Sequence, residues 1–173
     1  MNLRVHFLSQ IKLTDNEREE LRNKLVVDGD YEENTKRIIY TIYNVDMKKK
    51  IDYIVYATRS LMDEKISVDD YFRICNTIVA VIYEDLVYLK DNIDKKELDY
   101  NMSVQALLNV GVVTRGQDPT NPEYSYFFTP YAEKIYKFAI CPEDHHNIAF
   151  QNPKPASYLE ETPEDKILGL FNK

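Results

Sequence analysis

Apolar residues recur at steps of three and four over the first two thirds of the chain, a pattern typical of amphipathic helices around a shared core. The first helix is predicted over residues 15–25, because Thr14 as N-cap and Glu17 three residues later form a capping box. From Tyr31 the same spacing continues as far as Met62 and predicts one long helix or two abutting helices.

The widest apolar face lies between residues 67 and 89, where Ser67 offers an N-cap and the spacing predicts a single central helix. We expect the centre of the core on that face, at Phe72, Cys75, Ile78, Val79, Ile82 and Leu86. A further helix is predicted over residues 95–109, with Leu98, Met102, Leu107 and Leu108 as its apolar side.

The period changes after Gly111, a glycine placed where a left-handed residue would end the preceding helix. Residues 112–115 and 124–128 are strand-like and flank a polar loop with its tip at 119–122, which predicts an antiparallel hairpin. Thr129, followed by a proline, then begins a helix that runs to residue 140. The predicted fold class is therefore mainly α, a helical domain with one two-stranded β-hairpin.

Three regions follow from this reading of the chain. Residues 1–66 form a helical region that we expect to serve as a dimerisation unit, and residues 67–140 contain the hairpin. Residues 141–173 form an extended tail that ends in a short amphipathic helix, begun at Thr162. We expect that helix to fold back on its own domain or to contact a second copy, since its apolar side chains would otherwise stay in water. These side chains are Ile167, Leu168, Leu170 and Phe171.

The segment between Leu107 and Thr129 resembles the second half of a winged helix-turn-helix domain. It has a helix, then Leu-x-x-x-Gly-Val-Val-x-Arg, a polar loop, Tyr-x-Phe-x-Thr-Pro and another helix. The resemblance implies a recognition helix over residues 95–109, a hairpin that acts as the wing, and a DNA-binding or regulatory role. The side chains expected to contact DNA are Lys95, Lys96, Arg115 and Lys134.

Charge favours a second interpretation, a protein-binding module with the same fold. A net charge of -7 opposes the long-range attraction to phosphate, and the predicted recognition helix has Asp94, Glu97 and Asp99 at or near its start. The 14 tyrosines offer either packing or an interaction surface. Partner contacts are then expected at Tyr124, Tyr126, Ile167, Leu168 and Phe171. A third reading, an inhibitor that presents carboxylates in place of phosphates, requires the 29 acidic residues to gather on one face, and the sequence spreads them.

Catalytic chemistry has weak support. Cys141, His145 and His146 lie close together with two carboxylates, but no second pair of metal ligands follows at a usable spacing, which favours a polar linker. Four glycines leave no phosphate-binding loop, and no nucleophile motif occurs. We expect a protein that is not an enzyme and has no cofactor or metal.

Two further expectations concern the solvent exposure of a lysine run and the location of the protein in the cell. The run Lys48 to Lys50 spreads across a helix and is predicted to be a solvated face. No apolar stretch is long enough to span a bilayer, so we expect no membrane contact. Cys75 and Cys141 are expected to stay reduced, which favours the cytoplasm. We also expect the protein to be a homodimer.

Overall fold

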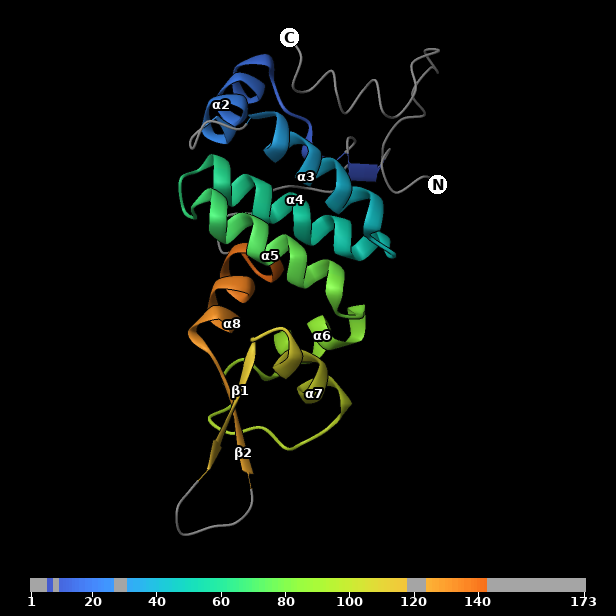
Figure 1. Cartoon of the computed structure of the whole chain (residues 1–173), viewed down its shortest axis with the longest axis vertical. Coiled ribbons are helices and arrows are strands. Elements are labelled where there is room, and N and C mark those ends of the chain that lie inside the picture. Colours follow the sequence, from blue (N-terminus) through green and yellow to red (C-terminus); the bar gives the residue numbers. More distant parts are fainter. Residues whose placement is uncertain (1–5, 8–9, 27–30, 118–123, 143–173) are drawn as a thin grey trace.

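The computed structural model describes residues 6–7, 10–26, 31–117 and 124–142. The helices are stacked along the long axis, and a hairpin projects from one end (Figure 1). They are α2 (Asp15–Leu25), α3 (Tyr31–Asn44), α4 (Lys48–Met62), α5 (Val68–Ala80), α6 (Tyr83–Asn92), α7 (Met102–Asn109) and α8 (Pro130–Ile135), followed by the π-helix η1 (Tyr136–Ile140). The two strands are β1 (Val113–Gln117) and β2 (Tyr124–Phe128), and they pair antiparallel. The predicted mainly α class with one hairpin is confirmed.

The first two predictions of helix position hold closely. Helix α2 covers the predicted residues, and its capping box is complete: the Thr14 hydroxyl accepts from the Glu17 backbone N–H, and the Glu17 carboxylate accepts from the Thr14 backbone N–H. The following stretch is two helices, α3 and α4, because the chain is extended at Met47 (φ -136°, ψ 138°). Val45 in the connection is buried, so the break itself is packed into the core.

The predicted single helix over residues 67–89 is wrong, since α5 and α6 are separate helices. Ser67 caps α5 as expected, but Val81 and Ile82 are both extended, with ψ of 159° and 162°. The carboxylate of Asp85 accepts from the backbone N–H of Ile82 (3.3 Å) and so helps to start α6.

This break moves one predicted core residue to the surface. Val81 takes the inward position at 4% exposure, whereas Ile82 is 56% exposed. Val79 is only partly buried. The prediction of burial is confirmed for Phe72, Cys75, Ile78 and Leu86.

The predicted helix over residues 95–109 is wrong in its first half. Helix α7 begins at Met102, because the Asn101 side chain accepts from the Val104 backbone N–H (3.0 Å) and caps it. Leu98 is buried by an isolated bridge to β2, in which its N–H donates to the Tyr126 carbonyl (2.9 Å). Met102, expected on the apolar side, is 80% exposed.

Helix α7 ends as the glycine predicts. Gly111 has φ of 76°, and the Val112 N–H donates to the Leu107 carbonyl (2.9 Å), which forms a Schellman motif. The predicted hairpin is confirmed, with Val113 paired to Phe128 and Gln117 to Tyr124. The predicted tip at 119–122 lies outside the described residues.

The helix after the hairpin also forms where it is predicted, as α8 and η1. The Thr129 hydroxyl does not cap it, because it donates to the carbonyls of Gly111 and Val112 (3.0 Å each) and so ties the helix start to the end of α7.

One core connects the regions on either side of residue 66. Helix α4 packs against both α5 and η1, and the Ser60 hydroxyl of α4 donates to the Phe138 carbonyl of η1 (3.0 Å). The division into regions 1–66, 67–140 and 141–173 stays a prediction, and the tail helix lies outside the described residues. Among the helices that the structure describes, none has the length and apolar character needed to cross a membrane.

The lysine run at the start of α4 differs from the expectation of a solvated face. Lys48 and Lys49 are exposed, but the side chain of Lys50 is 1% exposed and its ammonium pairs with Asp46 (2.8 Å). Asp46 lies just before α4, four residues before Lys50 in the sequence.

Candidate interaction surface at the hairpin

Two side chains of the predicted wing contact each other on one face of the hairpin. Arg115 on β1 lies opposite Tyr126 on β2, and its guanidinium carbon is 4.4 Å from the centre of the Tyr124 ring. This distance is typical of a cation–π contact. Tyr124 nevertheless remains 48% exposed, so one part of its ring is free to contact another molecule.

The loop before α7 adds a third tyrosine to this face. The Leu98 bridge places the loop along β2, and the Tyr100 ring lies 5.4 Å from the Tyr126 ring, centre to centre. The Tyr100 hydroxyl donates to the Gln105 side chain on α7 (3.3 Å). Tyr100 is 58% exposed and Tyr126 is half-buried, so Tyr126 supports the more exposed ring.

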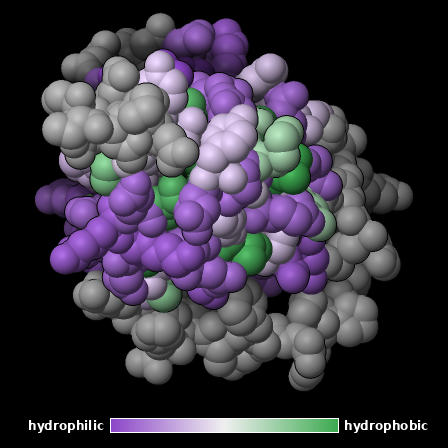
Figure 2. Space-filling model, turned by 90° about the horizontal axis from the view of Figure 1, so that it is seen from below, coloured by the Kyte–Doolittle hydropathy of each residue, from purple (hydrophilic) through white to green (hydrophobic). Residues whose placement is uncertain are grey.

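We call the set Tyr100, Arg115, Tyr124 and Tyr126 the hairpin face. The molecule viewed from the hairpin end shows hydrophilic side chains over most of the described surface, with hydrophobic patches between them (Figure 2). Mixed surfaces of this kind suit a partner that offers both apolar and polar groups.

The basic residues predicted to contact DNA are not gathered in one patch. Lys95 and Lys96 are exposed in the loop between α6 and α7, where Asp94 and Glu97 flank them in sequence. Glu97 in turn accepts a hydrogen bond from the Ser125 hydroxyl of β2. This loop therefore brings carboxylates as well as lysines to the hairpin.

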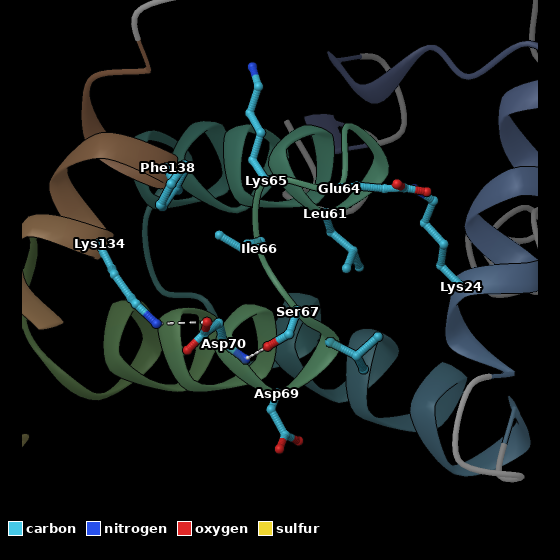
Figure 3. Close-up of a pocket in the computed structure, with 11 residues that line it drawn as sticks. Lys24, Leu61, Glu64, Lys65, Ile66, Ser67, Asp69, Asp70, Lys134 and Phe138 are labelled. Carbon is cyan, nitrogen blue, oxygen red and sulfur yellow. Dashed lines mark hydrogen bonds and ion pairs between the residues drawn. The ribbon is translucent and has the colours of Figure 1, made fainter.

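Lys134 lies apart from the other three. Its ammonium is 2.8 Å from the carboxylate of Asp70, and its side chain extends from α8 toward α5 (Figure 3). Of the predicted DNA contacts, the structure thus places Lys95, Lys96 and Arg115 near the hairpin and Lys134 beside α5.

Tyr124 and Tyr126, predicted as partner contacts, do lie together on one face. Ile167, Leu168 and Phe171 fall outside the described residues. Tyr100 was not predicted as a partner contact, because it was assigned to the interior of a longer helix. Asn101, the next residue, is a favourable N-cap residue and is the signal that a helix begins there.

The polar cluster after η1 is described only in part. Cys141 is partly exposed beside a cavity of about 350 Å³ lined also by Asp94, Glu133 and Tyr136, and His145 and His146 lie outside the described residues. Within the described ranges no three metal-ligating side chains come together. Burial raises the pKa of the Cys75 thiol to about 12, so this buried cysteine stays protonated and unreactive.

Comparison with known proteins gives no relative: no protein-family model matches the chain, and no curated protein or solved structure shows significant similarity to it. The geometry of the hairpin face is therefore the observation on which a functional proposal rests.

Proposed function

We propose that this chain is a non-enzymatic, winged-helix-like interaction module that binds a protein partner through the hairpin face. Its supporting observation is that Arg115 contacts the exposed Tyr124 ring, while the exposed Tyr100 ring packs on Tyr126 of the same face. Tyrosine and arginine are enriched at protein interfaces, because they offer large contact areas together with a polar group.

Charge supports a protein rather than a duplex as the partner. DNA affinity comes largely from lysines and arginines that neutralise phosphates, and it requires a local basic patch when the net charge is -7. Lys134 is paired with Asp70, and Lys95 and Lys96 are adjacent in sequence to carboxylates. The hairpin end therefore has a mixed charge, which a protein surface with its own mixture of charges can match.

A DNA-binding or regulatory role is the second candidate, and α7 is the observation that favours it. The acidic residues that we assigned to the predicted recognition helix lie before α7, and α7 itself has no charged side chain. Gln105 and Asn109, which bond to each other (2.9 Å), are residue types that read adenine in the major groove. Lys95, Lys96 and Arg115 would then supply the phosphate contacts.

A photo-cross-linking experiment tests the first proposal in the full chain. A benzophenone amino acid replaces Tyr124 on the hairpin face or Tyr40 on α3, a matched tyrosine that is 69% exposed. Irradiation is carried out in cells of the source organism, and the adducts are identified by mass spectrometry. We expect discrete protein adducts from position 124 that are not formed from position 40.

The outcomes separate the candidates. Nucleic-acid adducts from position 124, or equal patterns from the two positions, would overturn the protein-binding proposal. We also propose that the chain forms the homodimer predicted from its sequence, and adducts between two copies from position 40 would support a dimer with α3 in the interface. We also propose a cytoplasmic location, because Cys75 and Cys141 are both free thiols, as is usual in a reducing compartment.

A further inference from the structure

A groove of about 570 Å³ is lined by no residue of the hairpin face. It is bounded by the turn from α4 into α5, by η1 and by the end of α2 (Figure 3). Its apolar side chains are Leu61, Ile66, Val68 and Phe138. Leu61 and Ile66 are buried and form the floor, and Val68 and Phe138 are partly buried at its walls.

The charged side chains on the rim are largely satisfied already. At one end the Lys24 ammonium binds the Met62 carbonyl (2.6 Å) and the Glu64 carboxylate (3.0 Å). At the other end Lys134 binds Asp70 (2.8 Å). A ligand therefore gains little from these charges, and the groove is suited to apolar side chains.

We propose that the groove binds the C-terminal segment of the same chain, residues 162–171. The described part of the chain ends at Pro142, four positions after Phe138, which forms one wall of the groove. The segment that follows has four large apolar residues at helical spacing, and they are Ile167, Leu168, Leu170 and Phe171. The occupant is thus an amphipathic segment that is tethered next to its site.

Tether length permits this contact. Residues 143–161 separate the described part of the chain from the segment, and a chain of that length can span at most roughly 65 Å when fully extended. Because the segment and the groove belong to one chain, their association is an intramolecular step, which raises the effective concentration of the segment at the groove. Modest apolar contacts then suffice to keep the groove occupied, without a partner protein.

Cross-linking within the full chain tests this proposal independently of the hairpin face. A benzophenone amino acid replaces Leu168 in the segment, or Lys154 in the tether as a control, and the adducts are mapped by mass spectrometry. We expect position 168 to label residues 61–68 or Phe138, and position 154 to label them much less. Mixed isotope-labelled chains distinguish adducts within one chain from adducts between chains.

Two matched substitutions test the groove itself. Val68→Asp places a carboxylate in the groove at the first position of α5, and Ile82→Asp places one at the cap of α6, outside the groove. Acidic residues are favourable at helix N-termini, so both variants should keep these helices. We expect Val68→Asp to reduce the adducts from position 168 several-fold and Ile82→Asp to leave them unchanged, at low and at high salt.

Three results would overturn the proposal: labelling from position 168 that maps outside the groove, labelling mainly between chains, or no labelling. If circular dichroism shows that Val68→Asp does not unfold cooperatively, this variant is not folded and cannot test the groove. The adduct map from position 168 in the otherwise native chain then decides whether the segment binds there. Loss of the protein adducts from position 124 would leave this proposal standing, because no residue of the hairpin face lines the groove.

Discussion

Glu17 links the cap of α2 to the middle of the fold through Arg59 on α4. One oxygen of its carboxylate accepts from the backbone N–H and the hydroxyl of Thr14 (2.7 Å each), and the other accepts from the Arg59 guanidinium (2.6 Å). The same guanidinium donates to the Ile11 carbonyl. A local helix cap is therefore also a tertiary contact.

This arrangement predicts an acid-sensitive contribution to stability. The pKa of Glu17 is lowered from 4.5, first by the hydrogen bond from the Thr14 backbone, then by the Thr14 hydroxyl and by Arg59. The stabilisation is therefore present above pH 4.5 and is lost as pH falls through the lowered folded-state pKa. Glu17→Gln should reduce the free energy of unfolding by about 1 kcal/mol at pH 7. In urea unfolding the difference from the native chain should shrink toward pH 3, whereas Glu19→Gln on the same helix should change little at either pH.

The break between α5 and α6 predicts opposite results for two isoleucines four residues apart. Ile78 is fully buried and Ile82 is 56% exposed. Ile78→Ala should cost about 2–5 kcal/mol through the cavity that it leaves, and Ile82→Ala less than about 0.5 kcal/mol. Chemical unfolding of the two variants measures both values. Similar losses would mean that residues 67–89 form a continuous helix after all.

The same break shows which parts of the fold the sequence could predict. The caps at Thr14 and Ser67 and the turn at Gly111 depend on residues within a few positions, so a local pattern reveals them. No glycine or proline marks the break at Val81. Leu98 is buried by its pairing with Tyr126, a residue far along the sequence, and the same pairing brings Tyr100 to the hairpin face. No local pattern indicates that contact.

The stability lost on substitution of Gly111 should depend only on how readily the new residue adopts a left-handed backbone conformation. Its φ of 76° is left-handed, and a Cβ added there would meet no atom within 4 Å. Gly111→Ala should therefore cost about 1 kcal/mol, from the left-handed conformation and not from a clash. Gly111→Asn should cost less, because asparagine visits that region more readily. Equal losses in thermal unfolding would show that the conformational explanation is wrong.

The ion pair of Lys50 and Asp46 predicts that removing Lys50 reduces stability less than removing Asp46. The Lys50 side chain is 1% exposed and the Asp46 side chain 61% exposed, so only the lysine has given up its hydration. Lys50→Met keeps the volume and removes the buried charge, and should change stability by less than about 1 kcal/mol. Asp46→Ala leaves the ammonium buried without this partner and should cost about 1–3 kcal/mol. The exposed Lys48→Met is the control, and a larger loss for Lys50→Met than for Asp46→Ala would contradict the argument.

Salt dependence separates the two functional candidates. If a duplex is the partner, Lys95, Lys96 and Arg115 contact phosphates, and each contact removed should lower the magnitude of the log-affinity against log-salt slope by about 0.9. The measurement is retention of a random-sequence duplex pool between about 50 and 200 mM salt. It compares the native chain with Lys96→Ala plus Arg115→Ala, and with Lys48→Ala on the distant α4 as control. The protein-binding proposal predicts no retention at about 50 mM salt, because the acidic net charge opposes phosphate and the hairpin end has mixed charge. Retention that the double variant weakens and Lys48→Ala does not would instead establish α7 and the hairpin as a DNA-binding surface, and the protein-binding proposal would fall.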